Sequence, residues 1–219
     1  MQKIKVYNAH CCGEIGDVIV KSSVILQGET ILEQSQYLLE NKKLRNFLLN
    51  EPRGGVFKHC NLIVPPINIK AVAGFIIMEP EDNPPMSGSN SICVATVLLE
   101  KNLIPMQEPV TKFFLEAPGG LVKVKAECLH KKVKSIKIEN LPSYVDKLEE
   151  TIEGEEFGSV TVSTVFGGDS FVICNASDFN LSIHPNFAKD FVRTSSKILR
   201  AANEQLGFLL ILPDLATLV

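Results

Sequence analysis

Residues 86–91 read Met-Ser-Gly-Ser-Asn-Ser, and residues 92–99 continue as Ile-Cys-Val-Ala-Thr-Val-Leu-Leu. Serine and asparagine are favoured at helix N-termini because their side chains accept hydrogen bonds from the first free backbone N–H groups. The run that follows is apolar on every side, and a helix with that pattern is buried on all its faces. The segment therefore predicts a loop of small residues that leads into the N-terminus of a buried helix.

The N-terminus of such a helix has a second property. Its first N–H groups lack partners inside the helix, and the helix dipole places its positive end there. An anionic group such as a substrate carboxylate binds well at this position. Ordinary capping of a core helix leaves the same sequence pattern, so the residues alone keep both interpretations open.

On either side of this segment the pattern alternates between strands and helices. A broken helical region is expected at Ser23–Leu49, and Pro185 begins a clear amphipathic helix that reaches Leu206. The acidic residues 149–156 predict a solvated connection. The expected strands cover residues 3–8, 17–20, 56–64, 71–78, 109–116, 120–128, 160–165 and 170–174. This order predicts an α+β architecture.

Composition narrows the class of protein. The 219 residues are 45% hydrophobic and 21% charged, which suits one large or two small globular domains. The net charge of −3 argues against a nucleic-acid binder that relies on a basic surface. The sequence has no apolar stretch long enough for a membrane span and no signal-peptide core, so a cytoplasmic location is expected.

The six cysteines lie mostly in apolar runs and lack the spacing of a metal motif. We therefore expect buried thiols, neither a disulfide framework nor a zinc site. A change of composition within residues 131–156 predicts two lobes, residues 1–130 and residues 131–219. The alternating lysines of residues 123–137 predict a solvent-facing or protected sheet edge. The apolar tail Phe208–Val219 predicts self-association, for example as a homodimer.

Several short motifs together resemble the proline racemase family, which includes 4-hydroxyproline epimerases and trans-3-hydroxy-L-proline dehydratases. The matches follow the family's order along the chain up to about Gly207. They are residues 10–14 (His-Cys-Cys-Gly-Glu), 51–54 (Glu-Pro-Arg-Gly), 86–92 (Met-Ser-Gly-Ser-Asn-Ser-Ile), 166–168 (Phe-Gly-Gly) and 203–205 (Asn-Glu-Gln).

This resemblance implies the fold of diaminopimelate epimerase: two similar lobes, each a curved mixed sheet around a central helix. It implies an imino acid, hydroxyproline or proline, as the small-molecule partner, and a reaction without cofactor or metal. Backbone N–H groups at the start of the central helix would hold the substrate carboxylate, here those of Gly88 and Ser89. That implication favours the anion-binding interpretation of the loop before Ile92.

Two positions of the Met86–Ile92 motif depart from the family. Ser87 stands where a catalytic cysteine is usual, and Ser89 stands where the family has histidine. A hydroxyl is a poorer base than a thiol at neutral pH, which weakens racemisation in both directions. Elimination needs one base and a proton donor for the leaving hydroxyl. The resemblance therefore implies a trans-3-hydroxy-L-proline dehydratase with Ser87 as acid or base, or alternatively a 4-hydroxyproline 2-epimerase or proline racemase.

The family also carries a later Asp-Arg-Ser-Pro-Cys-Gly-Thr-Gly-Thr segment with a second catalytic cysteine, which this sequence lacks. Neither Cys93 nor Cys174 matches that position. The expectation is an incomplete, truncated second lobe, and a third interpretation is a non-catalytic remnant or imino-acid-binding protein. His10 and Glu14 either approach the cleft or only hold their turn, and Arg53 is expected to brace its own turn.

Overall fold

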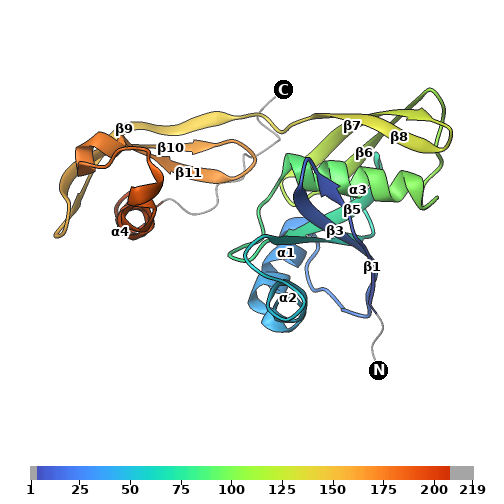
Figure 1. The fold of residues 1–219 in the computed structure, drawn as a ribbon, viewed down its shortest axis with the longest axis horizontal. Helices are drawn as coiled ribbons and strands as arrows, with labels where there is room; N and C mark the ends of the chain where they lie inside the picture. The colour runs from blue at the N-terminus through green and yellow to red at the C-terminus, as the bar shows by residue number, and fades with distance from the viewer. Residues whose placement is uncertain (1–3, 208–219) are drawn as a thin grey trace. The chain divides into compact units, whose positions relative to one another are not determined.

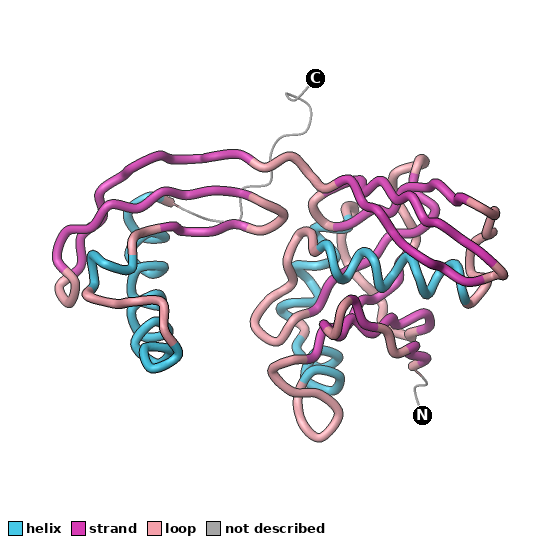
Figure 2. Tube along the Cα trace, turned by 45° about the horizontal axis from the view of Figure 1, so that its top comes forward, coloured by secondary structure: helices cyan, strands magenta, loops and turns pink. Residues whose placement is uncertain are grey.

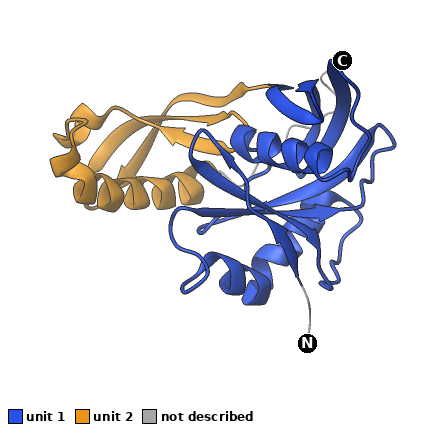
Figure 3. Cartoon of the chain, turned by 45° about the vertical axis from the view of Figure 1, so that its right-hand side comes forward, with its two compact units in different colours: residues 1–141 blue, residues 142–219 orange. Residues whose placement is uncertain are grey.

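The computed structural model describes residues 4–207. The chain divides into two compact units, residues 1–141 and residues 142–219, which we call unit 1 and unit 2 (Figure 3). The sequence places the boundary after residue 130, whereas unit 1 continues to residue 141. The difference arises because β8 (Lys132–Glu139) pairs with β7 (Gly120–Leu129) and also packs on the central helix of unit 1.

The described part of unit 1 contains one mixed sheet of eight strands (Figure 1). The strand order is β1-β3-β4-β5-β6-β7-β8, and β2 pairs with β3. The pairs β3–β4 and β5–β6 are parallel, and the others are antiparallel. The remaining bounds are β1 (Lys5–Tyr7), β2 (His10–Cys11), β3 (Glu14–Lys21), β4 (Lys58–Val64), β5 (Ala71–Met78) and β6 (Val110–Ala117).

Helix α3 (Gly88–Glu100) is the buried helix that the sequence predicts. Most of its residues are buried, and Val94, Ala95 and Leu99 are completely so. The helix packs against β3 near one end of the sheet and against β8 at the other end. The sheet therefore curves around α3, and the predicted α+β fold with a curved mixed sheet is confirmed for this unit.

Two shorter helices, α1 (Ile31–Glu40) and α2 (Lys42–Leu49), pack against β5 and β4 respectively. The helical region expected from Ser23 begins later, at Ile31. Thr30 and Glu33 form a capping box that fixes this start, and Gly28 has a φ of +130° that a helix cannot contain. Ile31, Leu38 and Leu44 belong to the apolar core on this side of the sheet.

The described part of unit 2 contains a three-stranded antiparallel sheet of order β11-β10-β9. The strands are β9 (Tyr144–Gly154), β10 (Gly158–Phe166) and β11 (Ser170–Ile173). The expected solvated connection at residues 149–156 is wrong, because β9 continues through Gly154. Its glutamates are exposed, and Ile152 is the residue of this strand that is buried against the core.

One long helix, α4 (Ala188–Leu206), packs against β9 and β11 (Figure 2). Two short 3-10 turns precede it, η1 (Ala176–Phe179) and η2 (Pro185–Phe187). The α-helix therefore begins three residues after the predicted start at Pro185. Its apolar stripe, with Ile198, Ala201 and Ala202, packs on Ile152, Val160 and Val162. The expected association of the tail lies outside the described residues. Within residues 4–207, no helix combines the length and hydropathy of a membrane span.

Candidate active site

The N-terminus of α3 carries the serine that the sequence singles out. Ser87 is the N-cap residue, with φ −140° and ψ 130°, and its carbonyl accepts from the Ser91 N–H at 3.0 Å and the Ser91 hydroxyl at 2.7 Å. Ser87, Gly88 and Ser89 are all half-buried and share one turn. The first N–H groups of a helix lack intrahelical partners, so this turn can receive an anion.

The Ser87 hydroxyl oxygen is held by several neighbours. It accepts from the Asn90 backbone N–H at 3.5 Å and from the Asn90 side-chain Nδ2 at 3.0 Å. The Ser89 hydroxyl lies 3.2 Å from it. Because donors that point at an oxygen favour its deprotonated form, this arrangement makes the Ser87 hydroxyl better suited to proton transfer than an isolated serine.

Asn90 connects Ser87 to three ionisable side chains. Its Nδ2 lies 3.3 Å from Glu79 Oε1 and 3.5 Å from His59 Nδ1. The same His59 nitrogen lies 3.4 Å from Glu14 Oε1 and 3.5 Å from Glu79 Oε1. The side chains come from β4, the start of β3, the residue that follows β5, and the N-cap and first turn of α3. We call Glu14, His59, Glu79, Ser87 and Asn90 the Ser87 cluster.

Buried groups beneath the cluster fix the orientation of Asn90. Asn61 is completely buried and donates from Nδ2 to Asn90 Oδ1 at 2.8 Å, so the Asn90 amide nitrogen faces Ser87. Beside it, Asp17 is also buried and binds Lys58 Nζ at 2.5 Å and Asn8 Nδ2 at 2.9 Å. Gly16 approaches the helix so closely that a Cβ there would lie 2.9 Å from Asn90 Oδ1. The amide is therefore locked between β3, β4 and α3.

The other residues discussed from the sequence have clear positions. His10 is exposed and accepts from the Gly13 N–H at 3.2 Å, so it holds the β2–β3 turn. Glu14, from the same motif, joins the Ser87 cluster instead. Arg53 stacks on Phe47 with 4.0 Å between the guanidinium carbon and the ring centroid, next to its own turn.

All six cysteines are free thiols. Cys60 and Cys93 are buried in unit 1, and burial raises the pKa of each thiol to about 12. Cys174 belongs to unit 2, where burial raises the pKa of its thiol. Within residues 4–207, no group of three or more His, Cys, Asp or Glu side chains has the geometry of a metal site.

Sequence reasoning missed His59, Asn61 and Glu79. A usable signal was present in β4, where His59 and Asn61 stand at alternate positions of a strand that ends in the apolar run Leu62–Val64. Alternate residues of a strand share one face, so a histidine and an asparagine two apart indicate a polar site on that face. Glu79 gave no comparable signal, because it follows β5 at the start of a loop.

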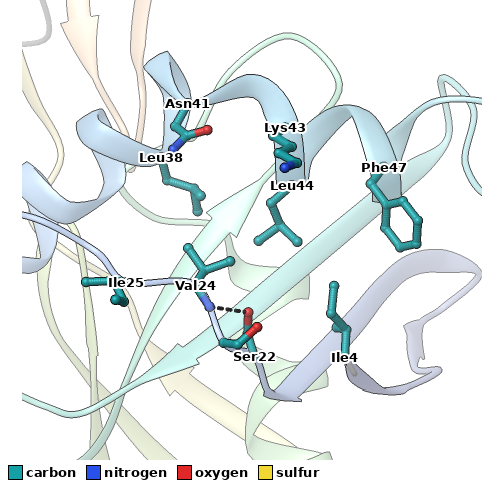
Figure 4. A pocket seen from close by; sticks show the side chains of 10 residues that line it. Ile4, Ser22, Val24, Ile25, Leu38, Asn41, Lys43, Leu44 and Phe47 are labelled. Atoms are coloured by element: carbon teal, nitrogen blue, oxygen red, sulfur yellow. Dashed lines mark hydrogen bonds between the residues drawn. The ribbon is translucent and has the colours of Figure 1, made fainter. Parts of the chain in front are cut away.

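Unit 1 also has an apolar pocket of about 400 Å³ at a different place (Figure 4). It lies between α2 and the extended segment at residues 22–25, with Val24, Leu44 and Phe47 among its lining side chains. No member of the Ser87 cluster lines this pocket. The pocket is therefore separate from the polar site at the start of α3.

Comparison with known proteins identifies relatives of this chain. The family model described as proline racemase matches residues 6–217, which extends past Gly207, where the sequence motifs end. A crystal structure of a hydroxyproline epimerase from Agrobacterium vitis, with bound trans-4-hydroxy-L-proline, is 34% identical with a TM-score of 0.80. The alignment covers 96% of this chain and 62% of that one.

Two further structures are similar. A probable proline racemase from Agrobacterium radiobacter with bound carbonate is 32% identical, has a TM-score of 0.81, and is matched over 93% of this chain and 61% of its own length. Methylitaconate-delta-isomerase shares the fold alone, at 15% identity and a TM-score of 0.52, over 93% of this chain and 62% of that one. The chain thus spans about three fifths of these proteins, and it belongs to the proline racemase family.

Proposed function

We propose that this protein is a trans-3-hydroxy-L-proline dehydratase that uses Ser87 to remove the α-proton. The observation that carries the proposal is the Ser87 hydroxyl at the start of α3, which accepts two hydrogen bonds from Asn90. Membership of the proline racemase family supports an imino-acid substrate. The bound trans-4-hydroxy-L-proline of the Agrobacterium vitis epimerase supports the same class of ligand.

The first turn of α3 is the proposed carboxylate site. The Gly88 and Ser89 N–H groups begin the helix, where free donors and the positive end of the helix dipole favour an anion. A Cβ at Gly88 would meet only Ile138 Cδ1 at 3.4 Å, so the space in front of this backbone is open to a small ligand. A carboxylate held there brings the substrate Cα close to Ser87.

The hydroxyl at position 87 favours elimination over epimerisation. Epimerisation requires its groups to take and return the α-proton in both directions, which suits thiols better than hydroxyls. Elimination requires one removal of the α-proton, after which the β-hydroxyl leaves irreversibly as water. Asn90 lowers the cost of that single step by donating to the oxygen that carries the charge.

A 4-hydroxyproline 2-epimerase is the second candidate. One observation favours it, namely the 34% identity to the Agrobacterium vitis epimerase over 96% of this chain. A protein that binds imino acids without turning them over is the third. The three candidates differ in what happens to the α-proton and the ring hydroxyl, and one experiment separates them.

That experiment is a proton NMR time course of the full chain in D2O with trans-3-hydroxy-L-proline and, separately, trans-4-hydroxy-L-proline. A dehydratase converts the 3-hydroxy isomer to pyrroline-2-carboxylate. An epimerase exchanges the α-proton of the 4-hydroxy isomer and yields its epimer. A binding protein broadens the ligand signals and leaves both compounds intact, a result that rejects the proposed dehydratase.

Substitution of Ser87 tests its role directly. Ser87→Ala removes the proposed base and is expected to abolish pyrroline formation. Ser196→Ala is the matched control, because Ser196 is exposed on α4 in unit 2 and its hydroxyl donates to the Val192 carbonyl of the same helix. The control should retain full activity. Equal activity of wild type and Ser87→Ala would contradict the assignment of Ser87.

A further inference from the structure

The proposed dehydration needs a proton donor for the departing hydroxyl, and Ser87 cannot be that donor while it takes the α-proton. In trans-3-hydroxy-L-proline the hydroxyl is trans to the carboxylate, so it lies on the same ring face as the α-proton. The base and the proton donor must therefore approach from one side of the ring. Both groups are expected within one side-chain cluster.

The Ser87 cluster contains one side chain suited to this task. The Ser89 hydroxyl does not ionise near neutral pH, and Asn90 is an amide that neither gains nor loses a proton. Glu14 Oε1 and Glu79 Oε1 lie 3.4 Å and 3.5 Å from the same nitrogen of His59, so both serve as carboxylate partners of the ring. Histidine is the side chain that exchanges a proton near neutral pH.

The contacts of His59 also fix which of its nitrogens is available. Nδ1 lies 3.4 Å from Glu14 Oε1 and 3.5 Å from Glu79 Oε1, so the two carboxylates hold this side of the ring toward themselves. Nε2 forms no hydrogen bond with any described residue. The side chain is 17% exposed, so a small ligand can reach it. Ser87 Oγ and His59 Nδ1 contact the same Asn90 amide nitrogen.

We propose that His59 is the catalytic acid that protonates the leaving 3-hydroxyl, on the same ring face as Ser87; this inference rests on the proposed dehydratase function. Before the step, the Ser87 hydroxyl gives its proton to solvent water, and His59 Nε2 takes one proton from solvent. Ser87 Oγ then takes the proton from Cα, and the C–H electron pair becomes the Cα–Cβ double bond. The Cβ–O bond breaks, and the oxygen leaves as water with the proton from His59.

The products are water and an enamine that tautomerises to pyrroline-2-carboxylate. Ser87 and His59 end in their starting protonation states, so the cycle needs no further reactant. The geometry also predicts stereochemical selectivity. In cis-3-hydroxy-L-proline the hydroxyl lies on the opposite face from the α-proton, out of reach of His59, and this isomer should react far more slowly.

The test compares two leaving groups with the full chain. Hydroxide needs a proton to leave, whereas fluoride leaves without one. His59→Gln should therefore lower elimination from trans-3-hydroxy-L-proline by about 10²- to 10⁴-fold, the usual contribution of a general acid. Elimination of fluoride from trans-3-fluoro-L-proline should fall less than about tenfold, because it needs only the base. His184→Gln, an exposed position in unit 2, is the matched control and should change neither rate.

Each outcome assigns a cause. Equal loss of both eliminations in His59→Gln would show that His59 only positions Ser87 or the fold, and would overturn its role as acid. Unchanged elimination of hydroxide would overturn it as well. If the wild-type chain consumes neither compound, the proposed function itself fails and the acid role falls with it. Ser87→Ala should abolish both reactions, which separates the base from the acid.

Discussion

Unit 1 and unit 2 each pair a sheet with a helix, but the two helices are buried to different extents. Helix α3 buries residues on all its faces and begins inside the curved sheet of unit 1. Helix α4 buries only Ile198, Ala201 and Ala202 and leaves Val192 68% and Leu199 47% exposed. The polar N-terminus of a fully buried helix must find partners among neighbouring side chains, whereas water satisfies that of an exposed helix.

The sheets differ in the same way. Phe75, Ile76, Ile77 and Met78 of β5 are 0% exposed, so this strand is buried on both faces. In unit 2, Val145 and Phe171 are 55% and 50% exposed and lie on either side of Val165 in the strand register. One face of the unit 2 sheet therefore carries exposed apolar side chains. The Ser87 cluster therefore lies in the unit where burial forces polar groups to gather.

The largest effect is expected from the same truncation made on the two helices. Leu99→Ala on α3 removes a side chain that is 0% exposed, and should lower the free energy of unfolding by about 2–5 kcal/mol. Leu199→Ala on α4 removes one that is 47% exposed and should cost less than about 1 kcal/mol. Urea unfolding followed by circular dichroism measures both, since the chain has no tryptophan. Equal losses of unfolding free energy in the two variants would mean that the leucines of α3 and α4 contribute equally to stability despite their different burial.

A glycine pair sharpens the comparison at the site itself. Gly16→Ala would place a Cβ 2.9 Å from both Asn90 Oδ1 and Cys93 Sγ, and the resulting overpacking should cost about 1–3 kcal/mol. The shift of Asn90 should also weaken its hydrogen bond to Ser87. Gly167→Ala in unit 2 is the control, because its Cβ meets only Ser143 Oγ, at 3.8 Å. A mild effect of Gly16→Ala would show that Asn90 is free to move.

The buried thiols of unit 1 predict a loss of stability at high pH. Burial raises the pKa of Cys60 and Cys93 from 9.0 to about 12, so the folded chain keeps protons that the unfolded chain releases above pH 9. Below pH 9 the two thiols do not change the free energy of unfolding. Above pH 9 each thiol lowers the free energy of unfolding by about 1.4 kcal/mol per pH unit. Unfolding of wild type and Cys93→Ala should therefore differ in slope between pH 8 and 10. Cys12→Ala, at an exposed position, should match the wild type.

The sequence predicted the parts of the fold that depend on local pattern. The buried helix, its serine cap and β5 follow from apolar runs and capping residues, which act within a few positions of the chain. The family motifs then predicted a site at Ser87. Errors arose where local pattern and tertiary pairing disagree, as in β9, whose glutamates suggest a loop although pairing with β10 makes it a strand.

The membership of the Ser87 cluster was only partly predictable. Glu14 belongs to a recognised motif, but His59 lies in β4, far from Ser87 along the chain, and Glu79 follows β5. They meet only because the curved sheet brings these strands to the start of α3. The loss of the family's histidine at Ser89 was visible in the sequence. The contact of His59 and Ser87 with the same Asn90 amide nitrogen could not be predicted from the sequence and is seen only in the structure.

The smallest expected effect concerns charge on the two sheets. Lys112, Lys125 and Lys137 lie directly opposite one another on β6, β7 and β8 of unit 1, and opposed like charges destabilise a sheet. Lys125→Glu converts two repulsive pairs to attractive ones and should stabilise the chain by about 0.5–1 kcal/mol. In unit 2, Lys197 pairs with Glu156, so Lys197→Glu should destabilise by a similar amount or less. Both shifts should shrink at 1 M salt, which screens exposed charges. If Lys125→Glu destabilises the chain at low salt, the lysine row stabilises unit 1 through its aliphatic packing, and repulsion is the minor contribution.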